Sequence, residues 1–206
     1  MARYTGPKVR VSRRLSTNIF ENEKGRKALD RRPFPPGAHG RTRRRNAGSE
    51  YLAQLQEKQK AKAIYGVLER QFRKTYEEAL RHQGNTGLNL LIMLETRLDN
   101  IVYRLGFASS RKAARQLIGH GHVEVNGKRV DIPSFRVLPG QEIRVAPSSR
   151  ELVSVHMAQE YASRGQPVSW LNIDTEKASG RLLERPTREA IPINAQEQLI
   201  VELYSK

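Results

Sequence analysis

The sequence contains no cysteine. Disulfides, thiolate nucleophiles and cysteine-ligated zinc are therefore excluded, and a small disulfide-stabilised secreted scaffold is not expected. No apolar run approaches the roughly 18 residues of a membrane span, and the basic N-terminus is not followed by the apolar stretch of a secretory signal. Aromatic residues are 6% of the chain and are scattered, so no stacking platform for single strands is expected. These absences favour a cytoplasmic protein without a membrane partner.

Acidic residues are scarce relative to basic ones: 21 Asp and Glu oppose 37 Lys and Arg, a formal charge of +16 over 206 residues. The excess is uneven, with net charges of +10 over residues 1–50, +3 over 51–94, +5 over 95–150 and −2 over 151–206. Basic segments bind phosphate by releasing counterions. The first 150 residues therefore predict a polyanion-binding surface, and the acidic remainder is expected to face solvent or a basic protein.

Motifs of catalysis and cofactor binding are missing as well. The sequence has no Walker-type phosphate loop, dinucleotide fingerprint, nucleophile elbow or zinc-protease motif. No group of side chains combines a nucleophile, a base and an orienting residue. His120 and His122 suggest a metal, but two histidines without cysteine or a carboxylate cluster make a poor zinc site, and a tight turn with polar contacts is favoured. We expect no enzyme, no metal and no cofactor.

Residues 1–50 contain few apolar residues and several prolines and glycines. Such a stretch cannot bury enough surface to offset its ordering entropy. It predicts a basic extended arm that becomes ordered on a partner, with a short helical turn near residues 24–30.

Helical periodicity follows this arm, and the expected caps are Ser49, Gly106 and Ser109. The predicted helices cover residues 50–82 (divided at Gly66), 88–105, 110–118 and 151–164.

The period changes to two near residue 122, and Asn126-Gly127 is a strong hairpin signal, because a type I′ turn needs two residues with positive φ. The predicted strands cover residues 122–125, 128–130, 134–137, 142–145, 169–173 and 180–183.

These elements predict an α+β fold with three parts. The parts are a basic extended N-terminal arm (1–48), a helical domain (49–87), and an α+β RNA-binding domain (88–183) with a helix-helix and antiparallel β module at about 95–158. Residues 194–206 are too apolar for a loose tail, so the C-terminal part 184–206 is expected to pack back on the helical domain.

Candidate RNA-binding residues gather in four parts of the sequence, residues 3–14, 39–45, 58–73 and 104–128. Four arginines occur in five residues after a Pro-Gly turn, and their planar forks suit phosphate, although a solvated charge run or a targeting signal is the alternative. Arg111 and Arg115 lie one turn apart on the helix that ends at Gly119, beside a helix N-terminus with free amides; ordinary surface charge is the alternative there. The full set is Arg3, Lys8, Arg10, Arg13, Arg14, His39, Arg41, Arg43, Arg44, Arg45, Lys58, Lys60, Lys62, Arg70, Arg73, Arg104, Ser109, Ser110, Arg111, Lys112, Arg115, His120, His122, Asn126 and Lys128.

Long ordered stretches resemble the bacterial small-subunit ribosomal protein S-four family along essentially the whole chain. They are MARYTGPK, PGAHG, EKQKAKAIYGVLERQFRK, RLDNIVYRLGF, SSRKAARQLIGHGHVEVNGKRVDIPS and LIVELYSK. The fifth also resembles an RNA-binding module of some RNA-modifying enzymes and tRNA synthetases. Some family members bind zinc through cysteines in the arm, so this cysteine-free sequence resembles the zinc-free type.

The resemblance implies a structural constituent of the small ribosomal subunit. Such a protein binds the five-prime domain of 16S rRNA early in assembly. The helical part and the α+β part both contact the RNA. The arginine run is expected near the mRNA entry channel, and the C-terminal part near the small-subunit protein S-five, at an interface tied to translational accuracy. The alternatives are an RNA-modifying enzyme with the same module and a free RNA-binding regulator that represses its own messenger.

Overall fold

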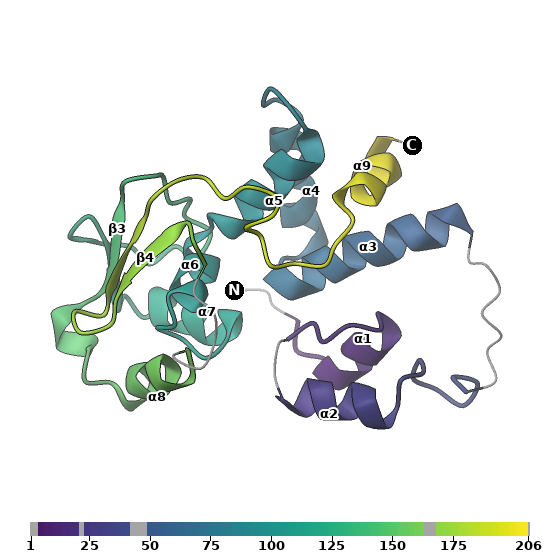
Figure 1. Ribbon diagram of the computed structural model, residues 1–206, viewed down its shortest axis with the longest axis horizontal. Helices are drawn as coiled ribbons and strands as arrows, with labels where there is room; N and C mark the ends of the chain where they lie inside the picture. Colours follow the sequence, from purple (N-terminus) through teal and green to yellow (C-terminus); the bar gives the residue numbers. More distant parts are fainter. Residues whose placement is uncertain (1–3, 21–22, 42–48, 163–167, 206) are drawn as a thin grey trace. The chain divides into compact units, whose positions relative to one another are not determined.

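The computed structural model describes residues 4–20, 23–41, 49–162 and 168–205. Within them the chain is mixed α+β, as predicted, with nine α-helices and one five-stranded antiparallel sheet (Figure 1). It divides into two compact units, one of Met1–Glu77 with Asn194–Lys206 and one of Glu78–Ile193. The division falls inside helix α4 (Glu69–Ala79) and at Asn194, whereas the sequence-based limits lie at residues 48, 87 and 183.

The first unit is helical. The Ser49 side chain accepts a hydrogen bond from the Leu52 N–H, and Gly66 ends α3 with a φ of 62°, so the predicted cap and break are both confirmed. Helix α9 packs along α3, which confirms that the C-terminal segment folds back. The elements are α1 (Lys8–Arg14), α2 (Glu23–Arg31), α3 (Glu50–Tyr65), most of α4, and α9 (Glu197–Ser205).

The expectation of an extended arm is wrong for the described part of residues 1–50, where α1 forms, but the helical turn predicted near residues 24–30 is confirmed and is longer, as α2. Arg13 joins α1 to the segment after α2. Its guanidinium donates hydrogen bonds of 3.0–3.4 Å to the carbonyl oxygens of Arg32, Phe34 and Pro35. It also lies 5.1 Å from the centre of the Phe34 ring. Charge-assisted hydrogen bonds and a cation–π contact therefore order this segment, although its low apolar content predicted no ordered structure.

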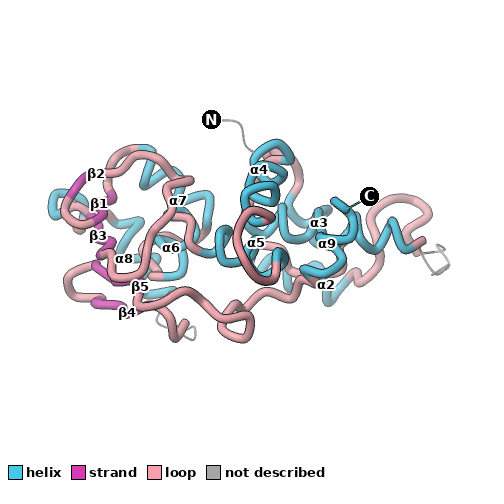
Figure 2. The backbone as a smooth tube through the Cα atoms, turned by 90° about the horizontal axis from the view of Figure 1, so that it is seen from above, coloured by secondary structure: helices cyan, strands magenta, loops and turns pink. Residues whose placement is uncertain are grey.

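The second unit is an antiparallel sheet with helices packed on it. The strands run in the order β2-β1-β3-β5-β4, so β4 and β5 extend the sheet that the Asn-Gly hairpin begins (Figure 2). Helices α6 and α7 pack on each other, and their apolar residues join those of the strands in one core. The elements are the end of α4, α5 (Thr86–Glu95), α6 (Leu98–Arg104), α7 (Arg111–Gly119), β1 (Val123–Val125), β2 (Lys128–Arg129), β3 (Glu142–Val145), a 3-10 helix (Pro147–Ser149), α8 (Val153–Ala162), β4 (Leu171–Asp174) and β5 (Ser179–Leu182).

The hairpin predicted at Asn126-Gly127 is confirmed. The two residues have φ values of 49° and 76°, both positive as a type I′ turn requires. The turn sets the register that places Glu124 opposite Arg129. Val125 is buried in the core, while Glu124 lies on the other face of the sheet.

The single helix predicted over residues 88–105 is wrong, because the chain breaks between α5 and α6. The Leu98 N–H donates to the Phe135 carbonyl at 2.8 Å, and the Asp99 N–H donates to the Pro133 carbonyl at 3.1 Å. In a continuous helix both donors would bond to carbonyls one turn earlier. A distant segment supplies these acceptors, so periodicity alone cannot reveal the break.

The strand predicted over residues 134–137 is wrong for the same reason. In the described structure, this segment makes one isolated antiparallel bridge, between Arg97 and Arg136, and is not a strand of the sheet. Its neighbourhood instead supplies the acceptors for the first N–H groups of α6, which have no partner inside their own helix.

Candidate nucleic-acid interface

Helix α7 carries three of the ten predicted RNA-binding residues of the second unit, Arg111, Lys112 and Arg115. It begins after Ser110, whose hydroxyl accepts a hydrogen bond from the Ala113 N–H at 3.3 Å. The predicted cap, Ser109, is therefore wrong by one residue, and Ser109 is exposed before the helix. Ala114 is buried in the core, so the helix turns its opposite side, which includes the half-buried Lys112, outward.

Both arginines predicted to share a face of α7 are held at Nε by residues of α6. Arg111 Nε donates to Asn100 Oδ1 at 2.8 Å, and Arg115 Nε donates to Asp99 Oδ2 at 2.6 Å. Arg111 is buried, with its guanidinium 4.6 Å from the centre of the Tyr103 ring. The Arg115 side chain keeps 17% of its surface exposed. The one-turn spacing of the two arginines predicted that they share a face, but it did not predict their hydrogen bonds to Asn100 and Asp99 of α6.

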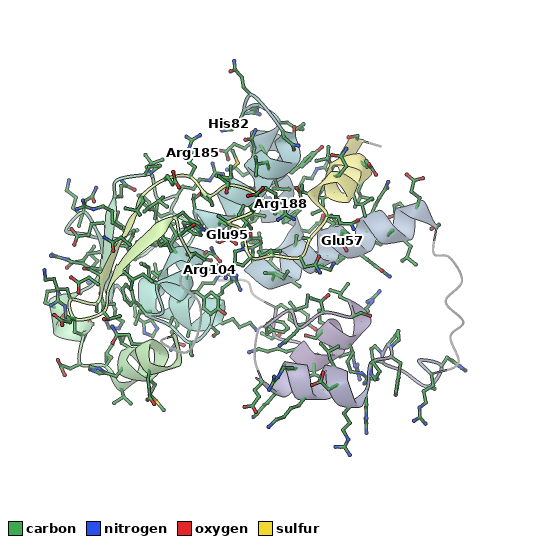
Figure 3. All side chains as sticks on the ribbon, in the orientation of Figure 1. Glu57, His82, Glu95, Arg104, Arg185 and Arg188 are labelled. Atoms are coloured by element: carbon green, nitrogen blue, oxygen red, sulfur yellow. The ribbon has the colours of Figure 1, made fainter. Side chains whose placement is uncertain are left out.

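Glu95, at the end of α5, is a fully buried carboxylate (Figure 3). It accepts a hydrogen bond from Asn100 Nδ2 at 2.6 Å and one from Arg104 Nη2 at 3.1 Å. Burial acts to raise the pKa of Glu95, but the charges of Arg104 and Arg111 and these hydrogen bonds outweigh it and hold the pKa below its ordinary value. Arg104, predicted to bind RNA, is therefore an ion-pair partner inside the unit.

Asp99 is the second buried carboxylate, with 2% of its side chain exposed. It accepts two parallel hydrogen bonds of 3.0 Å from Nε and Nη2 of Arg97, in addition to the bond from Arg115. None of the three anchoring residues, Glu95, Asp99 and Asn100, was predicted from the sequence. The only signal for them was polar residues at helix positions that the apolar period assigns to the core.

The turn after α7 lies against the hairpin. Arg129 Nη2 donates to the His120 carbonyl at 3.2 Å. A β-carbon at Gly121 would overlap the Arg129 guanidinium, and its φ of 76° also favours glycine. Arg129, which the sequence analysis did not name, is thus exposed beside the predicted residues His120, Asn126 and Lys128. Its place opposite Glu124 in the hairpin is the signal that identifies it.

His122 faces a different partner. Its Nδ1 lies 2.8 Å from the Ser149 hydroxyl, and its ring lies 6.0 Å from that of His120 in an edge-on arrangement. Across the described residues, no cluster of three or more His, Cys, Asp or Glu side chains has the arrangement to hold a metal ion. The helices described here are also too short or too polar to cross a membrane.

Two of the lysines predicted on α3 are paired inside the first unit. Lys58 and Lys62 place Nζ 2.7 and 2.9 Å from the two oxygens of Glu69, and the Tyr204 hydroxyl donates to Glu69 at 3.0 Å. Burial acts to raise the pKa of Glu69, but these three hydrogen bonds outweigh it and lower the pKa to about 2. Burial and the charge of Glu69 raise the pKa of Tyr204.

Lys60, the third lysine of this set, pairs with Glu57. The other Glu57 oxygen accepts a hydrogen bond from the Gln196 N–H at 3.0 Å, just before α9 begins (Figure 3). A carboxylate at a helix N-terminus favours the helix electrostatically. The basic face of α3 therefore serves in part to hold α9.

The remaining predicted residues of the first unit lie at the surface. Arg73 is ion-paired with Glu77 at 3.2 Å, and Arg41 lies 5.4 Å from the centre of the Phe34 ring. The exposed members of the set are Lys8, Arg10, Arg14, His39, Arg41, Arg70 and Arg73. Four predicted residues, Arg3, Arg43, Arg44 and Arg45, lie outside the described residues.

The exposed basic side chains of Lys128 and Arg129, on a hairpin that lies against the turn after α7, suit a nucleic-acid-binding class of protein. The sequence comparisons agree: residues 3–95 match the family model "Ribosomal protein S4/S9 N-terminal domain", and residues 96–143 match the "S4 domain". The chain is 50% identical to "Small ribosomal subunit protein uS4" of Salinibacter ruber and 52% identical to that of Cytophaga hutchinsonii, over 206 residues and all of each chain.

A third relative, the uS4 protein of Cutibacterium acnes, is 51% identical over 208 residues and again over all of both chains. The chain therefore belongs to the uS4 family of small ribosomal subunit proteins. This confirms the resemblance read from the sequence. The chain is an RNA-binding structural constituent of the small subunit and not an enzyme.

Proposed function

We propose that this chain is a primary binder of 16S ribosomal RNA that binds the five-prime domain and nucleates assembly of the subunit. The observation that carries the proposal is the surface formed by α7, the turn after it and the Asn-Gly hairpin. There Arg115 lies along α7, whose N-terminus is at Arg111, and the exposed Lys128 and Arg129 lie on the hairpin at the other end of the helix, where Arg129 donates to the His120 carbonyl. Guanidinium and ammonium groups neutralise phosphates, and helix N-terminal amides donate to them.

The first unit adds basic residues to this binding. Lys8, Arg10 and Arg14 are exposed on α1, and Arg41 is exposed at the start of the arginine run. We place this run near the path of messenger RNA, since arginines bind phosphates of any sequence and so suit a moving strand.

A protein contact is proposed for the face where α3 meets α9. The Gln54 side-chain amide donates to Glu50 at 3.0 Å and to Glu202 at 3.1 Å, so it joins carboxylates from both helices. Tyr51, next in sequence to Glu50, is exposed. Carboxylates and an exposed aromatic side chain on the same pair of helices suit a basic protein neighbour. We assign this face to the small-subunit protein S-five and to its part in translational accuracy.

The test is binding of the purified chain to a five-prime-domain fragment of 16S rRNA and to an unrelated structured RNA, over a series of salt concentrations. We expect the fragment to bind more tightly at moderate salt, and Lys128→Gln to reduce the salt slope by about 0.9. Lys177→Gln is the matched control, because Lys177 is an exposed lysine of the same unit that pairs with Asp174. Equal affinity for the two RNAs would refute the proposal, and equally tight binding to the chain's own messenger would favour the regulator.

A further inference from the structure

Two guanidinium groups of the first unit lie over one aromatic ring. Arg13 of α1 lies 5.1 Å from the centre of the Phe34 ring, and Arg41 lies 5.4 Å from the same centre. The ring is half-buried, and cations over a ring face are attracted by its quadrupole. Phe34 therefore connects α1, through Arg13, with Arg41, the first member of the arginine run.

The two arginines use their hydrogen-bond donors differently. Arg13 donates to backbone carbonyls of residues 32–35, as described above. Arg41 is exposed, and its guanidinium donates to no acceptor among the described residues. Contact with a ring face uses the charge of the guanidinium and none of its five N–H donors. The donors of Arg41 therefore remain available for the bidentate pairing with phosphate that suits arginine.

The backbone of the loop returns residue 41 to the ring of residue 34. The Gly40 N–H donates to the Gly37 carbonyl at 3.2 Å, and Gly37 has a φ of 110°. Gly40 is buried, and a β-carbon there would overlap the Pro35 carbonyl oxygen. Both positions of this tight turn require glycine. The placement of Arg41 therefore depends on the fold of the loop as well as on the ring.

We infer that Phe34 is a positioning residue for RNA binding, whose ring holds the Arg41 guanidinium where a backbone phosphate can pair with it. The inference rests on the function proposed above. An arginine side chain loses rotamer freedom when it pairs with phosphate, and a ring that already restricts it reduces this loss. Phosphate contacts do not read the bases, so the effect extends to any RNA that reaches Arg41.

Phe34→Leu tests the inference because it removes the ring and no charge. The general attraction between the basic chain and RNA then predicts an unchanged affinity. Positioning predicts about threefold to tenfold weaker binding of the five-prime-domain fragment of 16S rRNA. Phe34→Tyr keeps the ring and is expected to bind as the original chain does. Equal affinities of Phe34→Leu and the original chain, or equal losses in both variants, overturn the inference.

A double-mutant cycle separates positioning from a merely structural role. Arg41→Gln should weaken binding and lower the salt slope by about 0.9, and adding Phe34→Leu should then weaken binding no further. If Phe34 only stabilised the segment, its loss would persist in the Arg41→Gln background, because the other basic residues of α1 would also be displaced. An undiminished loss in that background, or an Arg41→Gln variant that binds as the original chain does, overturns the inference.

Two further measurements keep the result unambiguous. Amide hydrogen exchange over residues 29–35 establishes that the segment after α1 is folded in each variant, since the acceptors of Arg13 are backbone carbonyls that these substitutions keep. The unrelated structured RNA is titrated in parallel. If the original chain binds both RNAs equally, the proposed function fails, while the Phe34 and Arg41 variants still decide whether the ring positions the arginine.

Discussion

The surroundings of each arginine determine which acceptor its guanidinium binds. Arg13 donates to three backbone carbonyls, Arg104 to a buried carboxylate, and Arg129 to the carbonyl of His120 at the edge of the hairpin. All three carry the same charge and five donors. Sequence can place an arginine in a basic region, but the acceptor that it meets depends on residues far away in the chain.

At this scale we predict that Arg13→Lys loosens the α1–α2 segment in the free protein. Lysine keeps the charge but lacks the fork that reaches several carbonyls at once. Amide hydrogen exchange over residues 29–35 should show opening made easier by about 1–2 kcal/mol. Arg10→Lys, on the exposed face of the same helix, should change nothing. Equal protection in both variants would show that Arg13 has no structural role.

Two glycines of the second unit give a second prediction at residue scale. A β-carbon at Gly180 in β5 would overlap the Leu105 side chain and lie 2.8 Å from the Asn172 carbonyl, whereas one at Gly119 would meet nothing within 4 Å. Gly180→Ala should cost about 1–3 kcal/mol of unfolding free energy, and Gly119→Ala should be neutral or stabilising. Denaturant unfolding measures both, and equal midpoints would contradict the packing described for β5.

Whole elements in this chain are held by polar clusters as much as by apolar contact. Helix α9 stacks Tyr204 on Tyr76, with ring centres 4.5 Å apart, but the same tyrosine also donates to Glu69 of α4. Lys58 and Lys62 of α3 share that carboxylate. One glutamate therefore joins three helices, and this explains why lysines that the sequence analysis assigned to RNA are paired within the protein.

We predict that the docking of α9 depends on pH through Glu69. Its pKa is lowered to about 2 from an ordinary 4.5, so its contribution is complete above pH 4.5 and is lost as the pH falls through 2. Hydrogen exchange of the α9 amides should rise across this range. In Glu69→Gln that part of the pH dependence should disappear, because the amide does not titrate.

Tyr204→Phe is the control for this element. It keeps the ring that stacks on Tyr76 but removes the hydroxyl hydrogen bond to Glu69. Protection of α9 should fall above pH 4.5, and its dependence on pH should weaken, because the Tyr204 hydroxyl is the described contact that joins α9 to Glu69. Identical pH profiles for the original chain and Glu69→Gln would show that other carboxylates control the helix.

At the scale of the whole molecule, the +16 charge and the two compact units indicate that different residues serve folding and RNA binding. Each unit has buried residues of its own, while exposed basic residues occur in both. Such a charge destabilises the compact state by self-repulsion and strengthens association with a polyanion. RNA binding is therefore expected to raise the unfolding temperature of the chain.

This division gives a paired prediction. Val125 is buried in β1, so Val125→Asp places an unpaired charge in the core and should destabilise the second unit by roughly 3 kcal/mol or more. Replacing Arg43, Arg44 and Arg45 with glutamine should leave stability within about 0.5 kcal/mol and lower the salt slope of RNA binding by about 0.9 per lost phosphate contact. Thermal unfolding and salt-dependent binding distinguish the two, and intact RNA binding in both would contradict the division.

The sequence by itself determined the fold class, most helices and strands, the Asn-Gly turn, the return of the C-terminal segment and the family. These depend on local periodicity, turn chemistry and long ordered matches, all of which are properties of neighbouring residues. Only the tertiary structure decided that the described part of the arm is ordered, that the chain breaks between α5 and α6, and that β5 pairs with β3. It also decided which basic side chains are held by carboxylates. Each of these depends on an acceptor or strand from a distant part of the chain, and composition carries no record of such partners.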